Sequence, residues 1–196
     1  MGKEKRPLKK IESDGKTVWV TRPNLKEKNL LEERIKVYNT VLKAIEEDKD
    51  VDTIMQIAED FGKTLFKERI KERPEKWTIK NWLEPVVKNI FNPMGAAATF
   101  TKITDEEARS VIFRCPVYEE IEKNNISCLF SYGFARGLLK SVFPKGELIM
   151  GKTMGNGASL CEFVFKAEAT DEDKKEVEKI KQKFREIRKI RHSDEK

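Results

Sequence analysis

The chain of 196 residues contains a single histidine, and this scarcity removes several classes of site. His192 lies in the charged C-terminal segment, so a histidine-based catalytic triad, a zinc-protease site and a histidine-ligated haem are not expected. The sequence also lacks a Gly-x-Gly-x-x-Gly pattern after a strand, a Walker loop and a Gly-x-Ser-x-Gly nucleophile elbow. The usual signatures of dinucleotide binding, nucleotide hydrolysis and serine-hydrolase chemistry are therefore missing.

Long apolar runs are missing too. No stretch of 18 or more apolar residues is present, and the polar start of the chain is not followed by the apolar segment of a secretory signal. The three cysteines are an odd number without a disulfide-rich pattern, which is typical of a reducing compartment. We therefore expect a cytoplasmic protein without a membrane span.

Charged residues are abundant, at 38% of the chain, with 40 Lys and Arg against 34 Asp and Glu. Residues 1–10 carry five bases and one acid, and residues 171–196 carry ten bases and eight acids. The segment 11–170 is neutral, whereas nucleic-acid-binding domains concentrate their basic excess on the folded body. Nucleic acid is thus not an expected partner. Helices that mix Lys and Glu are also typical of thermophile proteins.

The first half of the chain predicts a short strand followed by helices. Residues 1–16 are expected to form a disordered basic arm, and residues 17–168 to form a single α+β domain. Within it, residues 17–93 are expected to be mostly helical, because apolar residues recur at three- and four-residue steps. The expected elements are a strand at 17–21 and helices over 31–45, over 54–65 with Asp52 as N-cap, and over 77–90.

The second half, residues 95–168, is expected to hold the sheet-containing core. It predicts an antiparallel sheet of four to five strands packed with helices. Residues 170–192 predict an amphipathic C-terminal helix capped by Thr170, whose apolar stripe can dock on the domain or contact a second subunit. The other expected elements are strands at 96–104, 108–115, 147–154 and 160–166 and helices at 117–123 and 127–141.

All three cysteines lie between Gly95 and Lys166. Cys115 ends a predicted strand, Cys128 opens a predicted helix and Cys161 lies in the last strand. A helix start favours a lowered thiol pKa at Cys128, and a thiolate there could bind zinc or act as a nucleophile. The alternative is that the three cysteines are small buried apolar residues.

The helix that begins near residue 127 carries further candidates. Cys128, Tyr132 and Arg136 follow one another at one-turn steps and are expected to share a face. The Arg136 guanidinium matches a carboxylate and could anchor an anionic ligand, with a surface salt bridge as the alternative. Gly133 and Gly137 mark a neighbouring face on which another element can approach closely.

Three motifs in this segment resemble a known family. They are Arg114-Cys-Pro-Val-Tyr118, the helix Cys128-Leu-Phe-Ser-Tyr-Gly-Phe-Ala135, and Gly155-Asn-Gly157 followed by Leu160-Cys-Glu-Phe-Val-Phe165. Together they resemble the L-2-amino-thiazoline-4-carboxylic acid hydrolase-like family and the related bacteriochlorophyll 4-vinyl reductase domain family. The resemblance covers about residues 95–167.

The resemblance implies a small-molecule-binding or sensing domain, and we expect a homodimer. It places the cysteines at the positions of residues proposed to hold a metal such as zinc, namely Cys115, Cys128 and Cys161. The expected ligand-binding residues are Tyr118, which is also a core candidate, Tyr132 and Arg136. One alternative is a hydrolase acting on a cyclic C–N bond of a small carboxylate such as 2-aminothiazoline-4-carboxylate, with no catalytic residues assigned. Another is a protein-interaction module that docks through the C-terminal helix.

Overall fold

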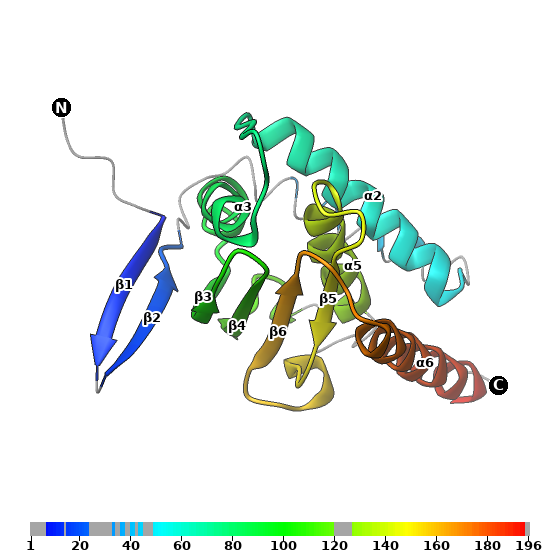
Figure 1. Cartoon of the computed structure of the whole chain (residues 1–196). Coiled ribbons are helices and arrows are strands. Elements are labelled where there is room, and N and C mark those ends of the chain that lie inside the picture. Colours follow the sequence, from blue (N-terminus) through cyan, green and yellow to red (C-terminus); the bar gives the residue numbers. More distant parts are fainter. Residues whose placement is uncertain are drawn as a thin grey trace.

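A computed structural model describes residues 7–13, 15–23, 33, 36–37, 40–41, 43–44, 49–119 and 127–194. It shows an antiparallel sheet packed with helices, in which the N-terminal strands lie at one end and the C-terminal helix at the other (Figure 1). The sheet has six strands in the order β1-β2-β3-β4-β6-β5. The expected α+β class is confirmed, with more strands than predicted.

The bounds of the elements follow the predicted pattern from residue 51 onward, except that the strand predicted at 147–154 ends at Met150. The strands are β1 Leu8–Ser13, β2 Lys16–Thr21, β3 Ala97–Ile103, β4 Glu107–Arg114, β5 Glu147–Met150 and β6 Cys161–Lys166. The helices are α2 Val51–Arg69, α3 Ile79–Val86, α5 Ser127–Lys140 and α6 Asp171–Asp194, with a π-helical turn η1 Val87–Phe91 and a 3-10 turn η2 Met154–Asn156. The helices expected at 31–45 and 117–123 lie largely outside the described residues.

The N-terminal arm is the main correction to the predicted fold. β1 pairs along its whole length with β2, through a turn at Gly15 with φ 71°. The disordered arm predicted for residues 1–16 is therefore wrong from residue 8 onward. The strand was missed because Leu8 and Ile11 are its only apolar residues, so it lacks the alternation of a half-buried strand. Charged side chains such as Lys9 are instead typical of a sheet edge, where they discourage pairing with another chain.

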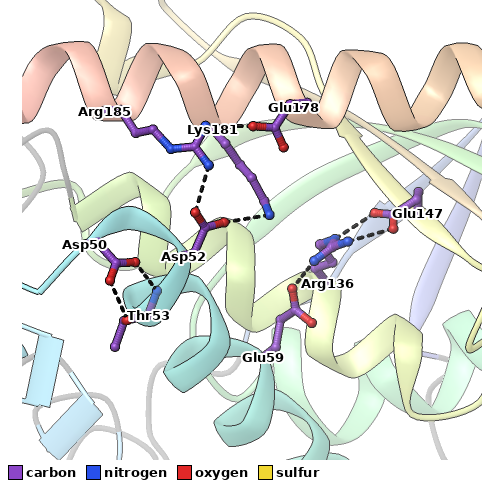
Figure 2. A network of polar contacts seen from close by, with 9 residues as sticks. All are labelled: Asp50, Asp52, Thr53, Glu59, Arg136, Glu147, Glu178, Lys181 and Arg185. Carbon is purple, nitrogen blue, oxygen red and sulfur yellow. Dashed lines mark hydrogen bonds and ion pairs between the residues drawn. The ribbon is translucent and has the colours of Figure 1, made fainter.

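Helix α2 begins one turn earlier than its apolar pattern indicates. The Asp50 carboxylate accepts a hydrogen bond of 2.8 Å from the Thr53 N–H, so Asp50, not the predicted Asp52, is the N-cap. Asp52 instead pairs with Lys181 and Arg185 of α6, at 2.8 and 2.7 Å (Figure 2). The start of α2 is thereby linked to the C-terminal helix.

Helices α2 and α5 approach each other through glycines. A Cβ at Gly133 would lie 2.8 Å from the Ala58 Cβ, and a Cβ at Gly137 would overlap the backbone of Glu59. Gly62 of α2 packs in the same way against the backbone of α5. The close approach predicted at Gly133 and Gly137 is confirmed, and it fixes α5 tightly against α2.

The C-terminal helix docks on its own domain. The Thr170 hydroxyl accepts a hydrogen bond from the Asp173 N–H at 3.2 Å, as expected of the cap. Val177, Ile180 and Phe184 are buried, and α6 contacts β5 and α2. Docking on the same chain therefore explains why these three apolar residues of α6 are buried. Within the described residues, no helix combines the length and apolar character needed to cross a membrane.

Candidate functional site

An apolar cavity of about 140 Å³ lies between the sheet and helices α2 and α5. Its floor follows from the strand register, because directly paired residues point to the same face of a sheet. One row across the sheet is Phe100, Ser110, Phe163 and Met150, and the next is Ala98, Ile112 and Cys161. All seven line the cavity. Ala98, Ser110 and Cys161 are the small side chains of these rows, and they leave room for the cavity between the larger side chains beside them.

The roof of the cavity is aromatic. Phe61 of α2 and Phe134 of α5 have ring centroids 5.6 Å apart, and Phe130 lies 6.1 Å from Phe61. These rings line the cavity together with Leu65, one turn beyond Phe61 on α2. Val37 and Val41, two helical residues that precede α2 in the chain, also line the cavity. The result is a mostly apolar cavity that suits a small apolar ligand.

The structure brings all three cysteines to this cavity. Cys115, Cys128 and Cys161 each line it, and the Cys161 sulfur accepts a hydrogen bond of 3.2 Å from the Met154 N–H. Burial raises the pKa of Cys128 to about 12, with Cys115 and Cys161 adding to the effect. Burial also raises the pKa of Cys161. The lowered pKa predicted for Cys128 is wrong, because the apolar surroundings disfavour a thiolate more than the helix start favours it.

Such thiols suit an apolar lining better than a cation site. A structural zinc ion needs deprotonated thiolates as ligands, and burial opposes that ionisation here. In the parts of the chain that the structure describes, no group of three or more His, Cys, Asp or Glu side chains could hold a metal ion. The zinc site implied for the cysteines therefore stays a prediction without geometric support.

Tyr132 is buried, Arg136 is half-buried, and neither of them lines the cavity. An α-helix advances 400° in four residues, so positions four and eight residues beyond Cys128 turn away by about 40° and 80°. The Tyr132 hydroxyl donates a hydrogen bond of 2.7 Å to the Leu148 carbonyl. Tyr132 thus fastens α5 to β5, and its predicted ligand-binding role finds no support in this placement.

Arg136 is held between two glutamates from other elements (Figure 2). Its Nε and one terminal nitrogen each donate a 2.6 Å hydrogen bond to Glu147 of β5, and the other terminal nitrogen pairs with Glu59 of α2. Burial opposes the charge, but the hydrogen bonds to Glu147 and the two carboxylates raise the pKa of Arg136. The guanidinium fork already binds carboxylates, though those of its own domain. Arg136 was predicted either to anchor a ligand or to form a surface salt bridge. It instead pairs with two glutamates of its own domain in a largely shielded cluster.

Sequence reasoning missed the two glutamates. Glu59 stands on the buried stripe of α2, at helical spacing from Met55, Gly62 and Phe66. A carboxylate on an otherwise apolar stripe was a signal that a buried cation would face it.

A second hollow of about 510 Å³ lies outside the cavity. Cys115 and Pro116 line both spaces, so the hollow adjoins the cavity at this point. Tyr118 lines the hollow with Phe113, and the two side chains are 40% and 51% exposed. Tyr118 is therefore a surface residue of this hollow, and its predicted place in the core is wrong.

Comparison with known proteins gives one family and one solved structure. None of the curated proteins matches the chain. A crystal structure of a trafficking protein particle complex subunit 3 from Naegleria fowleri, covalently bound to palmitic acid, is similar with a TM-score of 0.49 and 18% identity. The likeness covers 70% of this chain and 94% of that one, and it is too distant to bear on function.

The family finding is of a different kind, because it covers more than half of the chain. It names neither of the two families that the sequence motifs resemble, so that relation stays a prediction. Residues 34–166 match the family described as methanogen output domain 1, and the chain therefore belongs to this family.

Proposed function

We propose that this domain binds a small apolar molecule in the cavity between the sheet and helices α2 and α5. The observation that carries the proposal is the cavity itself, with its aromatic roof and mostly apolar floor. Its volume of about 140 Å³ is close to the roughly 150 Å³ of an engineered apolar cavity that binds benzene. Ligand sites are typically concave and mostly apolar, with a few polar groups that orient the ligand.

A sensing role is consistent with where the cavity lies. Its walls come from α2, α5 and five strands of the sheet, so a bound molecule would bridge the main layers of the fold. Helix α6 packs on two of the same elements, α2 and β5. The family is described as an output domain, which also agrees with a signalling role. The alternative hydrolase and interaction-module predictions find no comparable support in the described residues.

Thermal unfolding with benzene as the probe tests this proposal. A ligand at ten times its Kd stabilises the native state by about 1.4 kcal/mol, which raises the Tm of a domain of this size by roughly 3–6 °C. Ala135 lines the cavity on α5, so Ala135→Leu should fill part of the space and abolish the shift. Ala169→Leu makes the same exchange at another half-buried site away from the cavity, and it should leave the shift intact. An unchanged Tm of the wild-type protein at saturating benzene would refute the proposal.

A further inference from the structure

One charged group interrupts the apolar wall of the cavity. Glu33 lines it, and its Oε1 accepts a hydrogen bond of 2.7 Å from an Arg69 terminal nitrogen. Its other carboxylate oxygen, Oε2, is shielded from solvent and has no hydrogen-bond partner. Among the residues that the structure describes, it is the one buried side-chain oxygen or nitrogen in this condition.

An unsatisfied acceptor of this kind calls for an explanation. Nearly all buried polar groups in native proteins have a partner, because losing the hydrogen bonds of water without replacing them is costly. The ion pair with Arg69 engages only Oε1 of the carboxylate, so Oε2 has no hydrogen-bond partner. Thr21, another polar residue of the lining, is already occupied, since its hydroxyl accepts from the Ala98 N–H at 2.9 Å and donates to the Ala96 carbonyl at 3.2 Å. The unused acceptor thus stands beside a space sized for a small molecule.

We propose that Glu33 Oε2 accepts a hydrogen bond from the ligand, which is a small, uncharged hydroxyl compound with an apolar body, of the size of phenol. This inference rests on the proposed apolar binding function and names its ligand class. Arg69 already balances the charge of Glu33, so a neutral donor leaves the site neutral. An ammonium donor would instead bring an unpaired positive charge into an apolar enclosure. The ligand hydroxyl fits the free Oε2 of Glu33, and the apolar part of the ligand fits the mostly apolar lining.

Phenol and toluene form a matched pair of probes for the full-length protein, because they have nearly the same size and only phenol carries a donor. Isothermal titration should give wild-type protein a Kd for phenol at least tenfold lower than for toluene, since hydrogen bonds to charged groups are the strong ones. Glu33→Met keeps an unbranched side chain and removes the acceptor, so it should abolish this preference while toluene still binds. Glu68→Met, at an exposed position of α2, should preserve the wild-type ratio.

The outcomes separate this inference from the function on which it rests. Toluene binding with no preference for phenol in the wild-type protein would overturn the role of Glu33 and leave the apolar site standing. A preference that persists in Glu33→Met would do the same. If neither compound binds, the proposed function fails together with the inference. The wild-type comparison needs no variant, so it decides the matter even if Glu33→Met does not fold.

Discussion

At the scale of single residues, Arg136 joins three elements through its side chain. It stands on α5 and pairs with Glu59 of α2 and Glu147 of β5, and Lys140 adds a second cation to Glu147 at 2.8 Å. The guanidinium and both carboxylates are largely shielded, with exposed side-chain fractions of 13%, 8% and 9%. Removing one partner from such a cluster leaves a buried charge without compensation, which is the costly change at a buried ion pair.

Glu147→Gln is therefore expected to destabilise the protein by about 3 kcal/mol at pH 7, the lower end for a broken buried pair, because Glu59 remains beside Arg136. Urea unfolding measures this difference. Burial alone would raise the pKa of Glu147, but the hydrogen bonds from Arg136 and Lys140 outweigh it and hold the pKa below the usual 4.5. The stabilisation is therefore present above about pH 4.5 and is lost as the pH falls through the lowered folded-state pKa.

The difference between wild type and Glu147→Gln should thus shrink as the pH is lowered from 7 toward 3. Glu106→Gln provides the control, because Glu106 is exposed and lies outside this cluster. It should change stability by no more than about 0.5 kcal/mol. A gap between wild type and Glu147→Gln that stays constant over this range would contradict the assigned pairing.

At the scale of secondary structure, the crossing of α2 and α5 depends on glycine. Gly137→Ala forces a Cβ into the backbone of Glu59, and backbone cannot move aside as a side chain can. We expect a loss of about 1–3 kcal/mol, the usual cost of overpacking, measured by denaturant unfolding. At Gly151, a new Cβ would lie 3.3 Å from the Glu162 side chain, so Gly151→Ala should be tolerated. Equal losses in the two variants would show that the helix crossing is not the cause.

At the scale of the whole molecule, α6 is a docked part of the domain. Its buried stripe covers β5 and α2, and Lys181 and Arg185 fasten it to the start of α2. Deleting residues 171–196 should lower the Tm and expose apolar surface to a dye such as ANS. The described stripe is already buried within its own chain, so we expect light scattering to give the same number of subunits with and without α6. A dimer that becomes a monomer would instead assign the interface to this helix.

The sequence predicted the elements better than the site. The cap at Thr170 was predicted correctly because it depends on residues close in the chain. The glycines of α5 correctly marked a place of close approach, because a missing side chain is visible in the sequence, but the partner helix α2 was not. All three cysteines line the cavity, but the spacing of the cysteines in the sequence did not show whether they meet in space. The raised pKa of Cys128 was not predictable from its place at a helix start, because burial in the folded chain outweighs the effect of the helix.

The polar candidates failed for a similar reason. The partners of Arg136 come from positions 77 residues before it and 11 residues after it, so the cluster is visible only in the folded chain. The pairing of Glu33 with Arg69 likewise joins residues 36 positions apart. The periodicity of apolar residues can place a side chain on a helix face, but it cannot identify the charged residue of another element that pairs with it.

The floor of the cavity has a consequence for how ligand preference can change. Ala98, Ser110 and Cys161 are small residues set among larger ones on three neighbouring strands. Exchanging one of them for a larger or smaller side chain would alter the room above the sheet while the strands keep their register. Substitutions at these three positions would therefore change the size and shape of the cavity, so related proteins with the same fold could admit differently shaped molecules.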